Sequence, residues 1–140
     1  MTEKSCGFIL YKKEENSIKY LLVKSLRGIF GFPKGHMELD ETELMTALRE
    51  VKEEVGLNPF ILPEFKTSDS YSLENGNQKD VIYFLGEYNE EPTRQIDEIS
   101  DIELKSYEEA IQLFKFDSHK RMLKEANDYL TNYYNESCMD

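Results

Sequence analysis

Tryptophan is absent from this chain, and cysteine occurs only twice, at Cys6 and Cys138 near the two ends. So few cysteines, without metal-ligand spacing, exclude a disulfide-rich scaffold and a cysteine-based zinc site. We expect both residues to be free thiols in a reducing, cytoplasmic compartment. A disulfide joining the two ends of the chain is the alternative.

Long hydrophobic runs are also absent, and the first residues lead directly into a strand-like stretch. We therefore expect neither a membrane-spanning helix nor a signal peptide. Positive charge is scarce, because 17 lysines and arginines are outnumbered by 28 aspartates and glutamates, which gives a formal net charge of −11. Such a charge argues against binding to long nucleic acids or to anionic membranes.

The chain does contain enough apolar material for a globular core. Hydrophobic residues make up 39% and aromatic residues 12% of the 140 positions, and there are no repeats or low-complexity linkers. We therefore predict a single domain over residues 1–140 and expect it to be a monomer.

The order of the apolar patterns predicts an α+β fold. Strands are predicted at 5–12, 18–25, 60–66, 69–73, 80–88 and 98–105. The first two strands form a predicted hairpin, and Asn75-Gly76 is a strong turn signal. Helices are predicted at 107–114 and 118–133, and residues 135–140 are expected to fray.

The segment from Gly35 to Leu57 is the most informative, because it predicts a short helix with two opposed faces. Asp40 is its predicted N-cap, and Gly56 stands where a left-handed residue ends a helix. The apolar face, which must be buried, contains Leu44, Leu48, Val51 and Val55.

The other face of this helix gathers Glu50, Glu53 and Glu54 at positions i, i+3 and i+4. Three carboxylates so close together repel one another, and a hard cation such as Mg²⁺ or Mn²⁺ relieves that repulsion. For three glutamates alone, a solvated acidic surface is the alternative interpretation.

The complete spacing of this segment resembles the Nudix box. Gly35 is followed after five residues by Glu41, and after seven more by Arg-Glu-Val-Lys-Glu-Glu-Val-Gly-Leu at residues 49–57, so every fixed position of the motif is present. The resemblance implies an α/β/α sandwich with a mixed sheet between helices. It also implies hydrolysis of a nucleoside diphosphate linked to another moiety.

The same resemblance implies roles for the residues of the box. Glu50, Glu53 and Glu54 would hold Mg²⁺, with Mn²⁺ as a possible substitute, and the Gly35 carbonyl resembles the backbone ligand that the family often adds. Arg49 would hold the acidic helix in place by pairing with Glu41 or with a catalytic carboxylate.

Residues around the box resemble the asymmetric diadenosine tetraphosphate hydrolases. Pro33-Lys34-Gly35-His36 precedes the box as in that subfamily, and Lys-Asp-Val-Ile-Tyr-Phe-Leu at 79–85 is also similar. Two positions depart from the subfamily pattern. The tryptophan usual before Pro33 is missing, with Phe30 as the nearest aromatic residue, and Phe32 stands where proline is frequent.

This second resemblance implies Mg²⁺-dependent cleavage of diadenosine tetraphosphate into ATP and AMP. One alternative is a pyrophosphohydrolase acting on nucleoside triphosphates or on the 5′ triphosphate end of RNA. An alternative of another class is a Nudix-like module that binds a nucleotide without turnover. In each case the expected partner is a small nucleotide rather than a long nucleic acid or a membrane.

Further residues are candidates by their place around the box. The general base is Glu50, Glu53 or Glu98, where Glu98 matches a glutamate that closes over the site in the subfamily and an exposed loop carboxylate is the alternative. Lys34, His36 and Lys79 are candidate phosphate ligands.

Two aromatic residues are candidates for stacking on the nucleobase of the substrate. Tyr71 and Phe116 match positions where the subfamily stacks the base between rings. Packing in the core is the alternative for each.

Overall fold

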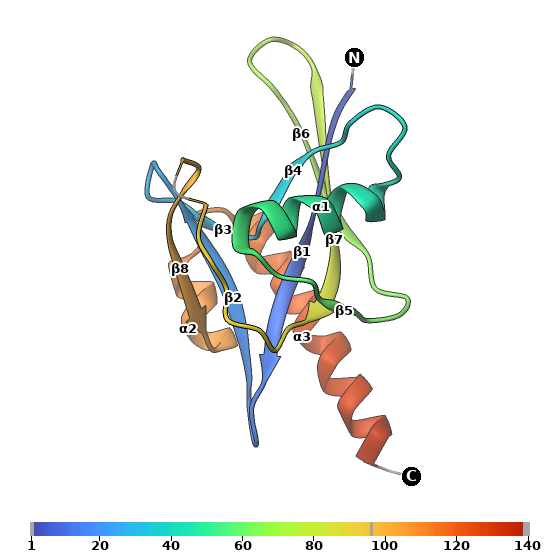
Figure 1. The fold of residues 1–140 in the computed structure, drawn as a ribbon, viewed down its shortest axis with the longest axis vertical. Coiled ribbons are helices and arrows are strands. Elements are labelled where there is room, and N and C mark those ends of the chain that lie inside the picture. Colours follow the sequence, from blue (N-terminus) through green and yellow to red (C-terminus); the bar gives the residue numbers. More distant parts are fainter. Residues whose placement is uncertain (1, 96, 139–140) are drawn as a thin grey trace.

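The computed structural model describes residues 2–95 and 97–138, which form one mixed sheet and three helices (Figure 1). In chain order the elements are β1 (Thr2–Lys13), β2 (Ile18–Ser25), β3 (Phe30–Gly31), β4 (Lys34–His36), α1 (Glu43–Val55), β5 (Phe60–Ile61), β6 (Thr67–Ser72), β7 (Gln78–Glu87), β8 (Ile99–Lys105), α2 (Tyr107–Leu113) and α3 (Asp117–Cys138).

Strand β1 is the centre of the sheet. It runs parallel to β7 along its length and antiparallel to β2 and β4, while β5 and β6 pair with β7, and β3 and β8 pair with β2. One parallel pairing among antiparallel ones confirms the predicted mixed sheet.

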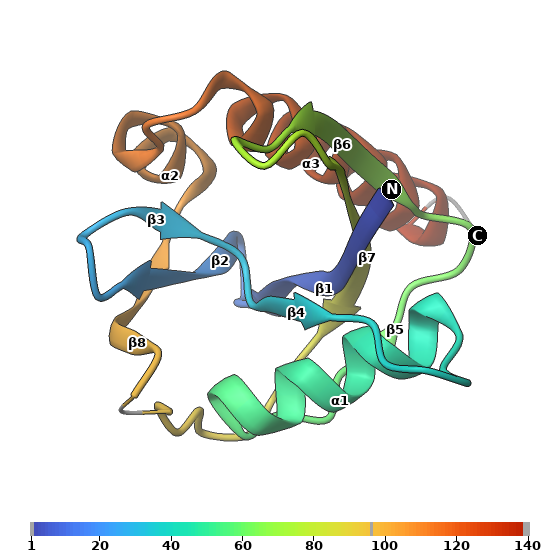
Figure 2. The ribbon, with the colours of Figure 1, turned by 90° about the horizontal axis from the view of Figure 1, so that it is seen from above.

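Alternating side chains of the central strands separate two cores. Phe8 and Leu10 pack in a cluster with Val51 of α1, whereas Ile9 and Tyr11 pack in a cluster with Leu123 of α3. Because successive strand residues point to opposite faces, α1 covers one face, and α2 and α3 cover the other (Figure 2). This arrangement confirms the predicted α/β/α sandwich.

Strands β1 and β2 pair directly over only part of their lengths. Their register runs from Leu10 opposite Leu21 to Lys13 opposite Ile18. Before Leu10 in the sequence, β1 pairs with β4 instead of β2. After Leu21, β2 pairs with β3 instead of β1. The two strands therefore diverge, and β4 brings the residues before α1 into the space between them (Figure 2).

The start of α1 differs from the prediction. Thr42, not Asp40, is the N-cap, and its hydroxyl accepts a hydrogen bond of 3.1 Å from the Met45 amide. Asp40 instead has a φ of 71°, a left-handed conformation that aspartate adopts more readily than most residues. The turn before the helix therefore places the capping hydroxyl two residues later.

Other boundaries also shift. The segment between the second predicted strand and the box, where no strand was predicted, contains the short strands β3 and β4. Helix α3 continues to Cys138 rather than fraying from residue 135. Residues 139–140 lie outside the described residues. Cys6 is a buried free thiol, as predicted, whereas the Cys138 side chain is not among the described ones. No helix in the described ranges is long and apolar enough to cross a membrane.

The end of α1 agrees with the prediction and fastens a loop to the helix. Gly56 has a φ of 68°, and its amide donates to the Lys52 carbonyl. The amides of Thr93 and Gln95 donate to the carbonyls of Val55 and Glu54 at 2.8 and 2.9 Å. The segment leading to β8 thereby satisfies carbonyls that a helix end leaves unpaired.

Replacing Gly56 by alanine should destabilise the protein more than replacing a comparable glycine. A Cβ there would lie 2.2 Å from Thr93 Oγ1, in addition to the strain of a left-handed alanine. We expect the free energy of unfolding to fall by about 2–3 kcal/mol, as measured by urea denaturation.

Gly28→Ala is the matched control for this effect. Gly28 has a φ of 83°, but a Cβ there would meet only the Lys24 side chain at 3.8 Å. We expect Gly28→Ala to cost about 1 kcal/mol from strain alone. When Thr93 is also replaced by alanine, Gly56→Ala should cost about as much stability as Gly28→Ala. If the two glycine substitutions cost the same in a chain that keeps Thr93, the close contact between Gly56 and Thr93 would be contradicted.

Candidate active site

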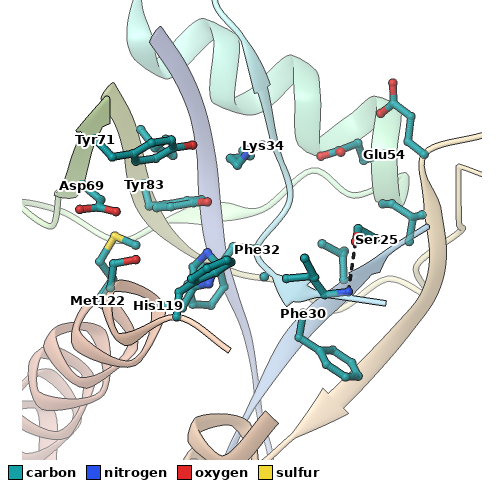
Figure 3. A pocket seen from close by; sticks show the side chains of 18 residues that line it. Ser25, Phe30, Phe32, Lys34, Glu54, Asp69, Tyr71, Tyr83, His119 and Met122 are labelled. Carbon is teal, nitrogen blue, oxygen red and sulfur yellow. Dashed lines mark hydrogen bonds between the residues drawn. The ribbon is translucent and has the colours of Figure 1, made fainter. Parts of the chain in front are cut away.

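A cavity of about 600 Å³ lies between residues of β2 and residues of β7 (Figure 3). Val23 and Ser25 of β2 line one side, and Val81 and Tyr83 of β7 line the other. Five predicted site residues also line it: Lys34, Glu54, Tyr71, Glu98 and Phe116. They come from β4, α1, β6, the turn before β8 and the segment before α3, so the fold brings together residues that are distant in sequence.

Glu54 is a buried acid at one end of this cavity. Its side chain reaches the wall from α1, and its Oε2 is buried without a hydrogen-bond partner in the described part of the chain. Burial raises the pKa of Glu54 to about 8, and the nearby Glu50 carboxylate adds to the rise. A backbone hydrogen bond from Lys34 opposes it. A buried acid with an unpaired oxygen has a strong preference for a cationic neighbour.

Arg49 organises the exposed side of the acidic helix. Its Nε and Nη2 donate to the two oxygens of Glu41 at 2.7 and 3.0 Å, and Nη1 donates to Glu50 at 2.8 Å and to Glu53 at 3.3 Å. Nη2 also donates to the His36 carbonyl at 3.0 Å. The predicted pairing of Arg49 with Glu41 is therefore present, and one guanidinium donates hydrogen bonds to several carboxylates at once.

Glu50 lies directly against the Gly35 backbone. Gly35 pairs with Cys6 across β4 and β1, and a Cβ at Gly35 would lie 2.0 Å from the Glu50 carboxyl carbon. Only glycine permits this approach. Burial raises the pKa of Glu50, and the hydrogen bond from Arg49 counteracts it.

These residues fit a divalent cation chemically. Glu54 offers a buried oxygen without a partner, and Gly35 brings backbone close to the Glu50 carboxylate. Among the described residues, no three acidic, histidine or cysteine side chains already form a metal-binding group. Arg49 instead donates hydrogen bonds to Glu50 and to Glu53, and the Glu53 side chain is 57% exposed.

Glu98 belongs to the turn before β8 and lines the cavity that Glu54 also lines. Its negative charge contributes to the raised pKa values of Glu50 and Glu54, which places the three acids within electrostatic reach of one another. The prediction that Glu98 lies near the box is therefore supported by its position, and its role stays a prediction.

Two predicted phosphate ligands do not line the cavity. His36 is exposed on β4, and its Nδ1 lies 3.3 Å from the Nζ of Lys79 on β7. Burial of Lys79 lowers its pKa. Lys79, Val81 and Tyr83 are two residues apart on β7, so their side chains point to the same face of the sheet. Lys79 therefore lies on the face that lines the cavity, but outside the cavity itself.

Sequence reasoning missed the other end of the cavity. The walls there include Phe32, Asp69, Tyr83, His119 and Met122 (Figure 3). Two sequence signals pointed to the polar members of this set. Asp69 stands two residues before Tyr71 and so shares its strand face, and His119 stands three residues after Phe116 at the start of a helix.

Phe30 and Phe32, the aromatic residues before Pro33, both line the cavity. Phe30 lines it, and its ring lies 5.5 Å from the Lys24 ammonium. Phe32 is buried against Tyr83 and Phe114, with ring centroids 5.2 and 5.3 Å apart. Tyr71 and Phe116 remain 43% and 47% exposed, so neither is an ordinary core residue.

Comparisons with known proteins agree on the family of this fold. A family model described as the NUDIX domain matches residues 1–126. The asymmetrical bis(5′-nucleosyl)-tetraphosphatase of Mus musculus is 33% identical over 144 residues, which cover 93% of this chain and 97% of the relative. The Sus scrofa protein of that name is 31% identical, with the same coverage of both chains.

Solved structures share the architecture. A Caenorhabditis elegans Ap4A hydrolase binary complex has a TM-score of 0.86 at 24% identity, covering 93% of this chain and 98% of the other. The NUDIX domain of Shewanella oneidensis NrtR, complexed with ADP ribose, has a TM-score of 0.77 at 20% identity, covering 93% and 89%. At these identities the likeness shows the fold alone.

The pairing of Glu41 with Arg49 predicts a specific pH dependence. The hydrogen bonds from Arg49 hold the pKa of Glu41 at about 2, against an ordinary value of 4.5. Because the folded state then binds fewer protons, this stabilisation is complete above the ordinary pKa and is lost as the pH falls towards 2. The stability advantage of wild type over Glu41→Gln should therefore shrink across that range.

Urea denaturation at a series of pH values measures this difference. Glu38→Gln is the matched control, because Glu38 lies 3.7 Å from Arg49 Nη1 and is 67% exposed. Its stability difference from wild type should stay nearly constant with pH. A constant difference for Glu41→Gln as well would contradict the assigned pairing.

Proposed function

The chain belongs to the NUDIX domain family of phosphoanhydride hydrolases, and from this membership we propose that it cleaves diadenosine tetraphosphate asymmetrically into ATP and AMP. The substrate assignment rests on the similarity to asymmetrical tetraphosphatases along nearly the whole of both chains. A cavity with acids at one end and aromatic rings at the other supports it, since the substrate combines polyphosphate with flat bases.

We assign the divalent cation to the carboxylates of Glu50, Glu53 and Glu54 and to the Gly35 carbonyl. When bound, Mg²⁺ or Mn²⁺ supplies charge neutralisation at phosphate oxygens and a water of lowered pKa. The buried, unpaired oxygen of Glu54 supports this assignment, because a cation ligand would satisfy it.

The basic residues of the site bind and orient the polyphosphate. Lys34 lies between the acidic and aromatic ends of the cavity, so its ammonium can neutralise phosphate oxygens there (Figure 3). His36 and Lys79, in contact outside the cavity, extend the binding region towards the far phosphates. These few placed cations offset the overall charge of −11, which would otherwise repel the substrate.

The remaining groups have two roles, which are proton transfer and binding of the nucleobase. A carboxylate of Glu50, Glu53 or Glu98 accepts the proton of the attacking water as the phosphorus–oxygen anhydride bond breaks. Tyr71 and Phe116, whose rings are partly exposed at the cavity, hold the base by stacking.

Product analysis tests the proposed reaction. Purified protein incubated with diadenosine tetraphosphate and Mg²⁺ should release ATP and AMP in equal amounts, as separated by anion-exchange chromatography. EDTA should abolish the reaction. Two equivalents of ADP would contradict the cleavage position, and pyrophosphate released from nucleoside triphosphates, with the tetraphosphate intact, would favour the alternative pyrophosphohydrolase.

Removing either acid from the proposed cation site should separate activity from stability. Glu53→Gln and Glu54→Gln should each lower kcat by about a hundredfold or more. Glu54→Gln should not lower the free energy of unfolding, because it removes a buried carboxylate that lacks a partner for one oxygen. The measurements are steady-state kinetics and urea denaturation.

Glu108→Gln is the matched control, because this exposed acid lies on α2, away from the cavity. It should leave both kcat and stability unchanged. Near-normal turnover in both site variants would overturn the assignment of the cation site.

A further inference from the structure

Two polar side chains in the aromatic end of the cavity have no hydrogen-bond partner among the residues that the structure describes. Asp69 and His119 both line the cavity, near Tyr71, Tyr83 and Met122 (Figure 3). Within the described part of the chain, neither side chain takes part in a hydrogen bond, and Nδ1 of His119 is buried. Polar groups in such a position normally have partners, so a ligand is the expected source of them.

The sheet fixes the direction of Asp69. It pairs with Val81 across β6 and β7, so its side chain shares the cavity face with Tyr71. In its ion pair with Arg121, the distance to Nη2 is 4.0 Å. Arg121 is already held by the Ser68 carbonyl at 2.7 Å and by Glu125 at 2.8 Å. Both Asp69 oxygens therefore remain available as acceptors.

His119 is held in place by rings rather than by hydrogen bonds. Its ring centroid lies 5.7 Å from that of Phe32, 5.2 Å from Phe114 and 6.1 Å from Phe116. Burial lowers the pKa of His119, which favours the neutral imidazole. A neutral imidazole offers one N–H donor and one acceptor.

This combination of polar groups distinguishes among the common bases. An aspartate carboxylate presents two adjacent acceptors and no donor. Guanine is the common base that has two adjacent donors, N1–H and the 2-amino group, on its pairing edge, with the O6 acceptor beside them. Adenine and cytosine place a ring-nitrogen acceptor next to one amino donor, and uracil places one N–H between two carbonyls. A carboxylate facing any of these bases would meet an acceptor.

We propose that Asp69 and His119 recognise guanine, so that the preferred nucleotide in this cavity carries guanine rather than adenine. Asp69 accepts hydrogen bonds from N1–H and the 2-amino group, and a His119 N–H donates to O6. Tyr71 and Phe116 hold the ring plane. The proposal rests on the proposed function for the polyphosphate part of the substrate, and it makes guanine-containing dinucleoside polyphosphates preferred over diadenosine tetraphosphate.

Calorimetric titration with GMP and with AMP, in the presence of Mg²⁺, measures base recognition without turnover. Wild type should bind GMP at least about tenfold more tightly than AMP, because charge-assisted hydrogen bonds form only with guanine. Asp69→Asn should reduce this ratio to about threefold or less. His119→Phe keeps a ring but removes the donor, and it should weaken binding of GMP while leaving AMP unchanged.

Asp80→Asn is the matched control. Asp80 is on the neighbouring strand β7, but its side chain points to the opposite face, and it accepts a hydrogen bond from Ser70. The Asp80 variant should keep the wild-type ratio, and circular dichroism establishes that every variant is folded. Equal affinities, tighter binding of AMP, no binding of either nucleotide at millimolar concentration, or an unchanged ratio in Asp69→Asn would overturn the proposal.

Hydrolysis assays on the same preparations separate this proposal from the proposed function. Diguanosine tetraphosphate should have a higher kcat/KM than diadenosine tetraphosphate. Selective GMP binding without cleavage of either tetraphosphate would refute the reaction and leave the base assignment standing. Cleavage of both tetraphosphates at equal kcat/KM, with equal binding of GMP and AMP, would support the reaction and refute the base assignment.

Discussion

The guanidinium of Arg49 is the interaction on which the geometry of the acidic helix depends. Glu41, Glu50 and Glu53 all contact it, and it also binds the carbonyl of His36. One rigid, permanently charged group thereby joins α1 to the loop before it and to β4. Without it, a chain with a net charge of −11 would have several carboxylates close together and no neutralising partner.

The second constraint is the divergence of β1 and β2. A fully paired sheet would have no interior space, but these strands exchange partners at Leu10, and β4 enters the gap with Lys34 and Gly35. The cavity that results is polar on one side and aromatic on the other. The same departure from regular pairing therefore brings backbone close to the acids of α1 and leaves room for a flat ligand.

The arrangement also explains how an acidic protein can have a polyphosphate substrate. Lys34 of β4 lies at the cavity, and Lys79 of β7 lies beside His36. The loop that carries Glu98 is fastened to the end of α1 by the Thr93 and Gln95 amides. Charge and acid groups are thus positioned by backbone contacts, which do not depend on the overall balance of charge.

Local patterns in the sequence predicted the elements well, because periodicity and turn chemistry act over a few residues. They identified α1 with its two faces, its left-handed end at Gly56 and most strands. They failed at Asp40, where a capping residue two positions later competes for the same helix start. Here two plausible caps were close in sequence, and the conformation of the preceding turn decided between them.

By itself, the sequence determined the acidic helix, the spacing of the box residues and the alternation of the central strands, since each follows from residues near one another in the chain. Only the tertiary structure decided which distant residues share the cavity. Asp69, Glu98 and His119 come from β6, a turn and α3, and nothing local links them. Their meeting depends on strand register and on where β1 and β2 part, because these set the distances between elements.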